Sequence, residues 1–469
     1  MTFNSLIYLI FLPIVVLIYF VLPNKIRPYF LLIVSYVFYA FSNIWLSFLI
    51  LGSTLLTYLC ALGIEKSENK NTKKFLLILS TTISLGLLFA FKYLNFFGQT
   101  LFNFIGLFNK NISYTTLNII LPVGISFFTF QTLSYVVDVY REDYKPVKNF
   151  FYYALFVSFF PQLVAGPIER IDHLLPQLLE EKQFHISNIT KASRYLVMGY
   201  VKKIVIADML SIFVDSVYSS LALSSGSSIL LATLFFYGQI YCDFSGYCDI
   251  AKGSAYLFGI ELMENFDRPY LSSSMSEFYR RWHISLGKWF KDYLYIPLGG
   301  NRKGKARQIL AIFFVFFFSG LWHGASWTYV LWGLYCGFFV ILESLVKVKN
   351  RDKRIFIPLT FIAVLISWIF FRCQSVEEIG ICFTRIFTSF ISGNGFESFD
   401  DKLYLVFSMI AFISIPLIDK LPSLDFEKED LNYSISTIAC YSVFIILIVL
   451  ASIYLNKVNK SGGFIYFQF

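Results

Sequence analysis

Four histidines are the candidate acid–base residues of this chain: His173, His185, His283 and His323. His323 lies inside an apolar stretch, residues 308–346, where an ionisable side chain is costly and marks a function by default. A neutral imidazole, with an ordinary pKa of about 6.5, accepts a proton near neutral pH. The residues alone leave two interpretations of His323, a catalytic base or a core histidine bonded to a backbone carbonyl. We expect His173 and His185 to be loop residues in a polar connecting stretch.

His283 belongs to a second candidate region, residues 275–293. Ser274 and Glu277 have the spacing of a capping box, which begins a helix. On a helical wheel, aromatic side chains lie on one face and basic side chains on the other. The aromatic residues are Phe278, Trp282, Trp289 and Tyr293, and the basic residues are Arg280, Arg281, Lys288 and Lys291. This pattern predicts one helix in the membrane interface that ends before Pro297. His283 falls at the border of the two faces, where a structural or headgroup-contacting role is the simpler interpretation.

The segment Tyr241–Asp249 carries two carboxylates within an apolar run. Asp243 and Asp249 are separated by about 240° around a helix, so they do not form a paired-carboxylate site. We expect Asp249 to pair with Lys252 one turn away. Asp243 has no such neighbour and is a candidate for a buried polar network or a pore lining. Gly246 indicates a helix break or a close contact between helices.

Several common kinds of enzyme site are not indicated. The sequence has no Gly-x-Ser-x-Gly elbow and no His-Glu-x-x-His zinc motif. Residues 299–305 approach a phosphate-binding loop, but Ala306 replaces the required Ser or Thr and no buried strand precedes it. The seven cysteines match no metal or redox spacing, so we expect them to be small apolar fillers of helices. We expect neither a metal nor a permanently bound cofactor.

The elements that position these residues follow from composition. Of the 469 residues, 57% are hydrophobic and 15% are charged, whereas soluble domains carry about 25% charged residues. Stretches of about 20 apolar residues, enough to cross a bilayer, recur from end to end. We therefore predict an all-α polytopic membrane protein with about 11 transmembrane helices, the first beginning at Ser5, plus re-entrant or interfacial helices. Residues 28–64 and 308–346 should each form a hairpin. The turn of the second, near Leu321–Trp327, would place His323 about 24 Å along the helix from Arg307, nearer the outer side.

The net charge of +9 is explained by topology rather than by nucleic acid. The basic residues gather in short loops, at 65–74, 302–307 and 347–354, and basic short loops stay on the cytoplasmic side of a membrane. We expect the lipid bilayer as a partner and no nucleic acid. We predict one membrane-embedded domain, 1–469, with N-terminal helices in 1–119, a core in 120–346 and C-terminal helices in 347–469.

Long, ordered motifs give the chain a family resemblance. They are Phe160–Arg170, Asp243–Ile250, Arg280–Leu286, Trp289–Arg302, Gly320–Gly324 and the closing Phe464–Phe469. In these motifs the sequence resembles the membrane-bound O-acyltransferase family, above all its bacterial branch of alginate, peptidoglycan and exopolysaccharide O-acetyltransferases. The resemblance implies a ring of helices around a thinned centre, with a central funnel open to the outside and access for an acyl donor from the cytoplasm.

The resemblance also assigns roles to residues. The family's invariant histidine corresponds to His323, and its second conserved polar position corresponds to His283, so both become candidate catalytic residues. Acetyl-CoA or another acyl thioester would be the donor. We expect its phosphates to be held by basic residues of this region, namely Arg280, Arg281, Lys288, Arg302 and Lys303. Headgroup binding explains the same charges equally simply.

The implied partners lie outside the cytoplasm. An esterase-like acetyltransferase would pass the acetyl group to a cell-surface polysaccharide, and the chain would be a multi-pass protein of the bacterial cytoplasmic membrane. Two alternatives stay open. One is D-alanyl transfer to teichoic acid from a carrier-protein thioester, and the other is an acetyl or polysaccharide transporter without chemistry of its own.

Overall fold

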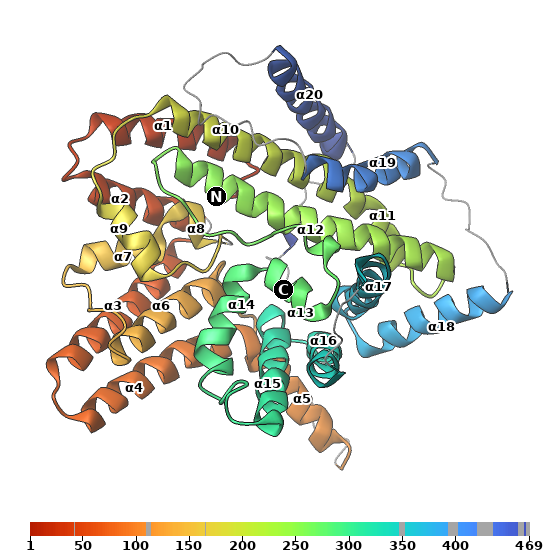
Figure 1. The fold of residues 1–469 in the computed structure, drawn as a ribbon, viewed down its shortest axis with the longest axis horizontal. Coiled ribbons are helices and arrows are strands. Elements are labelled where there is room, and N and C mark those ends of the chain that lie inside the picture. Colours follow the sequence, from red (N-terminus) through yellow and green to blue (C-terminus); the bar gives the residue numbers. More distant parts are fainter. Residues whose placement is uncertain are drawn as a thin grey trace. The chain divides into compact units, whose positions relative to one another are not determined.

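The computed structural model of the chain describes residues 1–41, 43–108, 114–164, 166–346, 352–392, 402–419, 435–457 and 464–465. Within these residues the regular structure is helical (Figure 1). The exception is one isolated antiparallel bridge between Phe266 and Trp282. Large apolar side chains such as Leu6, Phe48 and Leu359 are more than half exposed. Exposed apolar surface on apolar helices is typical of proteins that face lipid, and the predicted all-α membrane class is confirmed.

Five helical segments of the described residues are long and apolar enough to cross a membrane. They are α3 (Ile44–Lys66), the run Lys70–Gly106 that contains α4 (Lys70–Leu88) and α5 (Leu94–Gly106), α15 (Lys305–His323), α16 (Trp327–Val346) and α17 (Lys353–Arg372). Shorter apolar helices accompany them. The chain is therefore a polytopic membrane protein, and the number of about 11 spans stays a prediction.

The chain divides into two compact units, of which the first comprises residues 1–189 and 254–263. Its helices, besides α3 to α5, are α1 (Leu6–Val21), α2 (Arg27–Ala40), α6 (Ile125–Tyr140), α7 (Phe150–Ser158), α8 (Phe160–Leu163) and α9 (Ile171–Leu179). Helices α2 and α3 pack against each other, in agreement with the predicted hairpin of residues 28–64. The buried Glu169 accepts hydrogen bonds from the Met263 N–H (2.6 Å) and from His173 Nδ1 (2.7 Å). His173 lies in helix α9 and not in a loop, contrary to our expectation.

The second unit comprises residues 190–253 and 264–469 and holds both candidate catalytic histidines. Besides α15 to α17, its helices are α10 (Ile186–Tyr200), α11 (Asp208–Tyr218), α12 (Gly226–Tyr256), α13 (Met275–Arg281), α14 (Ile284–Phe290), α18 (Val376–Ser392), α19 (Lys402–Ile418) and α20 (Ile435–Lys457). Gly246 lies within an unbroken α12, where an added Cβ would come within 2.8 Å of the Gly199 carbonyl oxygen. Of the two predictions for Gly246, the close helix contact is therefore the correct one.

The predicted hairpin of residues 308–346 is confirmed. Helices α15 and α16 lie side by side and are joined by Gly324–Ser326, inside the predicted turn (Figure 1). The two backbones approach closely at glycine, since a Cβ on Gly333 would lie 2.3 Å from the Phe316 carbonyl oxygen and one on Gly320 would lie 2.4 Å from that of Tyr329. Small residues permit such close packing of helices in a membrane.

The prediction of one continuous helix over 275–293 is wrong. Helix α13 ends at Arg281, and α14 begins at Ile284 and leads into a π-helical segment, Lys291–Tyr295. The break falls at His283, whose φ of 45° is left-handed and incompatible with a continuing α-helix. The predicted start is correct, because the Ser274 hydroxyl accepts a hydrogen bond from the Glu277 N–H.

Candidate active site

A cavity of about 930 Å³ lies within the second unit and contains both candidate histidines on its wall. Side chains of α13, α14, α15 and α16 surround it. His283 is 2% exposed and His323 is 4% exposed, so both imidazoles are removed from bulk solvent. Arg280, Lys288 and Lys291 also line the cavity and are exposed. A cavity with a charged rim and buried imidazoles suits a ligand that has an anionic part and a reactive part.

His323 is the last residue of α15, at the hairpin turn. Its ring is enclosed by aromatic rings in edge-on contact, with centroid distances of 5.0 Å to Trp322, 5.0 Å to Trp332 and 5.3 Å to Phe371. Trp332 comes from α16 and Phe371 from α17, so three helices fix the orientation of one imidazole. An aromatic enclosure of this kind restrains the ring and excludes water.

His283 occupies the break between α13 and α14, and one residue of the facing loop holds that break in place. The backbone carbonyl of the buried Asn265 accepts from the Ile284 N–H (3.0 Å), and Asn265 Oδ1 accepts from the Ser285 N–H (3.1 Å). A left-handed conformation away from glycine costs on the order of 1–3 kcal/mol and persists only where the surroundings impose it. Such strain is concentrated at functional sites, and here it turns His283 into the cavity.

Burial decides the charge state of His283. Removal of the imidazole from water lowers the pKa of His283 to about 3. At neutral pH this side chain is therefore uncharged, with one ring N–H to donate and one ring nitrogen to accept. The two histidines flank one indole, because the Trp322 ring centroid lies 5.5 Å from that of His283 and 5.0 Å from that of His323.

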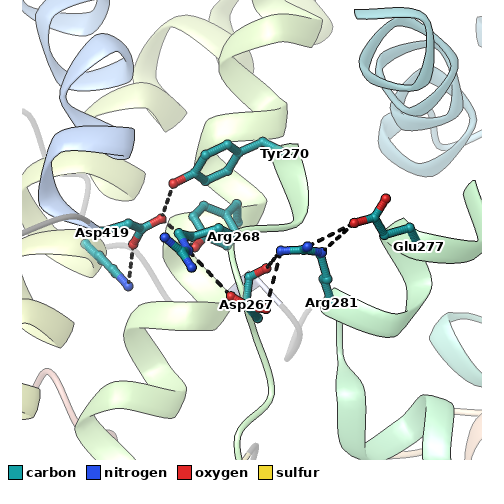
Figure 2. A network of polar contacts seen from close by, with 8 residues as sticks. Asp267, Arg268, Tyr270, Glu277, Arg281 and Asp419 are labelled. Atoms are coloured by element: carbon teal, nitrogen blue, oxygen red, sulfur yellow. Dashed lines mark hydrogen bonds and ion pairs between the residues drawn. The ribbon is translucent and has the colours of Figure 1, made fainter. Parts of the chain in front are cut away.

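The structure brings together some of the predicted donor-binding residues and not others. Arg280 and Lys288 line the cavity with both histidines. Arg281 does not, and instead forms ion pairs with Glu277 (2.9 Å) and Asp267 (3.3 Å), as Figure 2 shows. Arg302 and Lys303 lie in the exposed turn before α15 and do not line the cavity either.

Two cavity residues were not singled out from the sequence. Glu343 of α16 accepts hydrogen bonds from the Met275 N–H (2.7 Å) and the Ser276 N–H (3.0 Å), so it joins α16 to the start of α13. Trp332 packs on His323, and its buried indole Nε1 has no hydrogen-bond acceptor among the residues that the structure describes. No local motif marks either residue, because each contacts a segment far away in sequence.

The predicted polar network at Asp243 is present, with partners that the sequence did not indicate. Lys203 Nζ lies 2.5 Å from Asp243 Oδ1 and 2.8 Å from Asp208 Oδ1. Asp243 Oδ2 accepts from the Ile465 N–H (2.6 Å), which attaches the described part of the closing motif to α12. Residues 466–469 of that motif lie outside the described residues. Lys203 is a charged residue in an apolar run, and this is the feature of the sequence that could have identified it as a partner of Asp243.

The predicted pairing of Asp249 with Lys252 is wrong. Asp249 instead lies 3.0 Å from Lys202 Nζ, which also lies 3.1 Å from Asp419, and Lys252 pairs with Glu264. The Tyr241 hydroxyl donates to Asp419 Oδ2 at 2.8 Å, and so does the Tyr270 hydroxyl, which Figure 2 shows. The tertiary partners prevail because they approach the buried charges from facing elements, whereas Lys252 on the same helix is drawn to the loop that follows it.

Comparison with known proteins gives a consistent result. The sequence model of the membrane-bound O-acyltransferase family matches residues 31–377. The probable alginate O-acetylase AlgI of Pseudomonas aeruginosa is 37% identical over 384 residues, which are 80% of this chain and 73% of that protein. The peptidoglycan O-acetyltransferase of Helicobacter pylori is 34% identical over 414 residues, covering 80% and 78%. The teichoic acid D-alanyltransferase of Streptococcus thermophilus is 28% identical over 249 residues, covering 50% and 60%.

Proposed function

This chain belongs to the membrane-bound O-acyltransferase family, and from that premise we propose that it moves an acetyl group from cytoplasmic acetyl-CoA to a hydroxyl group reached from the outer side of the membrane. It is a membrane acyltransferase. The observation that carries the proposal is the cavity that two buried histidines with one shared indole neighbour line together with the exposed cations Arg280, Lys288 and Lys291.

The histidines supply the proton chemistry of the proposed reaction. The ring of His323 takes the proton from the attacking hydroxyl as its oxygen bonds to the thioester carbonyl carbon. A general base contributes about 10²- to 10⁴-fold to such a step. The tetrahedral intermediate then collapses, the carbon–sulfur bond breaks, and the leaving thiolate takes the proton back from His323. No covalent acyl-histidine is required.

Developing negative charge on the carbonyl oxygen needs a hydrogen-bond donor that is already in place. The neutral His283 offers one ring N–H, and the buried Trp332 Nε1–H on the same cavity wall offers another. Trp332 packs directly on His323, and His283 packs on Trp322, which itself packs on His323. We therefore assign the orientation of the thioester to these two donors.

The donor enters from the rim in this proposal. Arg280 and Lys288 provide positive charge at the cavity for the phosphates of acetyl-CoA, and Lys291 adds to them. Arg281, Arg302 and Lys303 stay in the proposal only as more distant attraction for the same phosphates. Since α15 begins at Lys305 beside the basic loop, this rim would face the cytoplasm and His323 would lie about 27 Å farther along the helix.

The acceptor side of the proposal is supported by the relatives. An alginate O-acetylase and a peptidoglycan O-acetyltransferase are named for polysaccharide products, which favours a cell-surface polysaccharide as the final acceptor. We propose that a separate esterase-like protein outside the cytoplasmic membrane of a bacterium carries the acetyl group from this chain to that polysaccharide.

The decisive experiment measures acetyl transfer from labelled acetyl-CoA in inverted membrane vesicles, which retain the acceptor on their inner side, and base-labile acetyl ester in whole cells. His323→Ala should abolish both signals while the protein remains folded in the membrane. His185→Ala is the matched control, because His185 is exposed and lies in the other unit. Unchanged acetylation in His323→Ala would refute the proposal.

The same experiment separates the alternatives. Labelling from acetyl-CoA without any carrier protein excludes D-alanyl transfer, which is also the more distant similarity, at 28% identity over half of the chain. A transporter without chemistry would still move acetyl groups or polysaccharide in the His323→Ala variant, whereas an acyltransferase would not.

A further inference from the structure

Two buried cysteines of the second unit lie in contact. Cys373 Sγ is 3.7 Å from Cys382 Sγ, and the side chains are 2% and 0% exposed. Both are free thiols in the structure. The six described cysteines are buried, as expected of small apolar fillers of helices, and this pair is distinguished by its sulfur–sulfur contact. We propose that Cys373 and Cys382 form a structural disulfide in the mature protein, independently of the proposed acyl transfer.

The local backbone holds the two residues together. Cys373 caps the C-terminal end of α17, and its N–H donates to the Ile369 carbonyl oxygen (3.1 Å). Helix α18 begins three residues later with a capping box, in which Ser375 Oγ accepts from the Glu378 N–H (3.2 Å) and Glu378 accepts from the Gln374 N–H (2.7 Å). This fixed turn returns the chain so that the second turn of α18 meets the end of α17. A disulfide requires the sulfurs to lie about 2.05 Å apart, so rotation of the two side chains has to close the remaining gap from 3.7 Å.

The pair also lies on the side of the membrane where disulfides persist. Helix α17 starts at Lys353 and Arg354, part of a basic loop that belongs on the cytoplasmic side, and it crosses about 30 Å before reaching Cys373. Cys373 is therefore at the outer end. Disulfides form and persist in extracytoplasmic, oxidising compartments and are rare in the cytosol.

The bond requires an oxidant of the disulfide class, such as a periplasmic dithiol–disulfide oxidoreductase. One cysteine thiolate attacks the oxidant's disulfide and releases one of its thiols, which leaves a mixed disulfide. The other cysteine, after losing its proton, attacks the sulfur of its partner and releases the second thiol. Two protein thiols are oxidised and one oxidant disulfide is reduced. Because both sulfurs are buried in the folded chain, the exchange takes place as this segment folds.

The position of the bond gives it a consequence for the cavity. Phe371, two residues before Cys373, packs on His323 at 5.3 Å and on Trp332 at 5.3 Å. Arg372, between them, binds Asp215 (2.9 Å) and lies over the Tyr218 ring (5.0 Å). A covalent tie to α18 at Cys373 thus secures the end of α17, the helix that contributes Phe371 to the enclosure of His323.

The test uses the full-length protein in cells quenched with acid, which traps thiols in their native state, and then alkylated under denaturing conditions. Trypsin releases both cysteines in one peptide, residues 373–385, because no Lys or Arg lies between them. We expect this peptide without alkyl groups and lighter by two hydrogen atoms, and cleavage at Glu377 or Glu378 should give two linked fragments. Reductant should restore two alkylated thiols. Full alkylation without reductant would overturn the proposal.

A second measurement does not depend on peptide recovery. Reductant applied to the purified protein during thermal unfolding should lower the melting temperature to that of Cys373→Ala/Cys382→Ala and leave that variant unchanged. Each single alanine variant should match the double variant, since one bond is lost in all three. A melting temperature of the wild-type protein that ignores reductant would contradict the proposal.

Discussion

The second unit buries ionisable side chains in two different ways. Around the cavity, His283 is buried among aromatic rings and its pKa falls to about 3, so the group is neutral. Around α12, Lys203 is equally buried but forms ion pairs with the carboxylates of Asp208 (2.8 Å) and Asp243 (2.5 Å). In the first region the free-energy cost of burying a charge is avoided because the group is neutral. In the second region that cost is offset because the charge is paired.

This difference distinguishes side chains that can transfer protons from side chains that hold helices together. A buried charge that is fully paired gives up its proton only at the expense of its partners, so it holds helices together and is a poor catalyst. A neutral imidazole has a ring nitrogen that can accept a proton when the reacting group releases one, so it can act as a general base. Lys203 joins α12 to the residues before α11, whereas the histidines face open cavity volume. The comparison therefore predicts that changes in one region affect turnover and changes in the other affect stability.

The largest expected effect is on turnover. His323→Gln keeps a polar side chain of similar size but cannot act as a base, so acyl transfer should fall about 10²- to 10⁴-fold. The aromatic enclosure remains, so the melting temperature should stay near that of the wild-type protein. Parallel measurement of transfer from acetyl-CoA and of thermal unfolding in detergent tests both parts. A variant that unfolds early with normal turnover would reverse the comparison.

A reciprocal effect is expected at the ion pairs. Lys203→Met leaves Asp208 and Asp243 buried together without their cation, which should lower the free energy of unfolding by about 3–5 kcal/mol. Adding Asp208→Asn and Asp243→Asn should recover part of that loss, because neutral amides no longer repel each other. Lys303→Met, at an exposed position, is the control. Denaturant titration of the purified variants provides the measurement, and equal stability of Lys203→Met and the control would argue against a structural role.

The pH dependence of stability should reveal His283. Its pKa is about 3 when folded and about 6.5 when unfolded, so between these values the unfolded chain binds more protons. Stability from this group is complete above pH 6.5 and is lost as the pH falls, by up to about 1.4 kcal/mol per unit. His283→Asn suits the left-handed backbone and does not titrate. The difference in melting temperature between wild type and this variant should therefore change between pH 7 and 5, and a constant difference would mean that His283 is not buried neutral.

The sequence predicted the parts of the site that depend on local pattern. The apolar run 308–346 with its Gly324–Ser326 interruption was sufficient for a hairpin with His323 at the turn. Charge in an apolar run marked Asp243 as a candidate for a buried polar network or a pore lining, and the structure shows the network. In each case the costs of burial in a membrane allow few alternatives, so a single stretch of sequence determines the outcome.

The parts that failed depend on contacts between distant segments. A helical wheel over 275–293 has no knowledge of Asn265, whose backbone and side chain accept the N–H groups that a continuing helix would have used. Nor could spacing within α12 show that Lys202 would take Asp249 away from Lys252. Such partners are chosen by the packing of whole elements, which local propensity does not record.

Glu343 has features of both regions, because it lines the cavity and its carboxylate is held by hydrogen bonds. Its substitution should have the smallest effect on stability and turnover. Its carboxylate lies on the cavity wall and is stabilised by backbone N–H groups of Met275 and Ser276 and by the Ser276 hydroxyl (2.7 Å). Glu343→Gln keeps the shape but loses charge-assisted acceptance, at about 1 kcal/mol of stability. Because α13 leads directly to the strained His283, the variant should also raise the KM for acetyl-CoA with little change in kcat. Glu377→Gln, on the exposed start of α18, is the control. A fall in kcat as large as that of His323→Gln would place Glu343 among the reacting groups and remove the distinction between paired charges and catalytic ones.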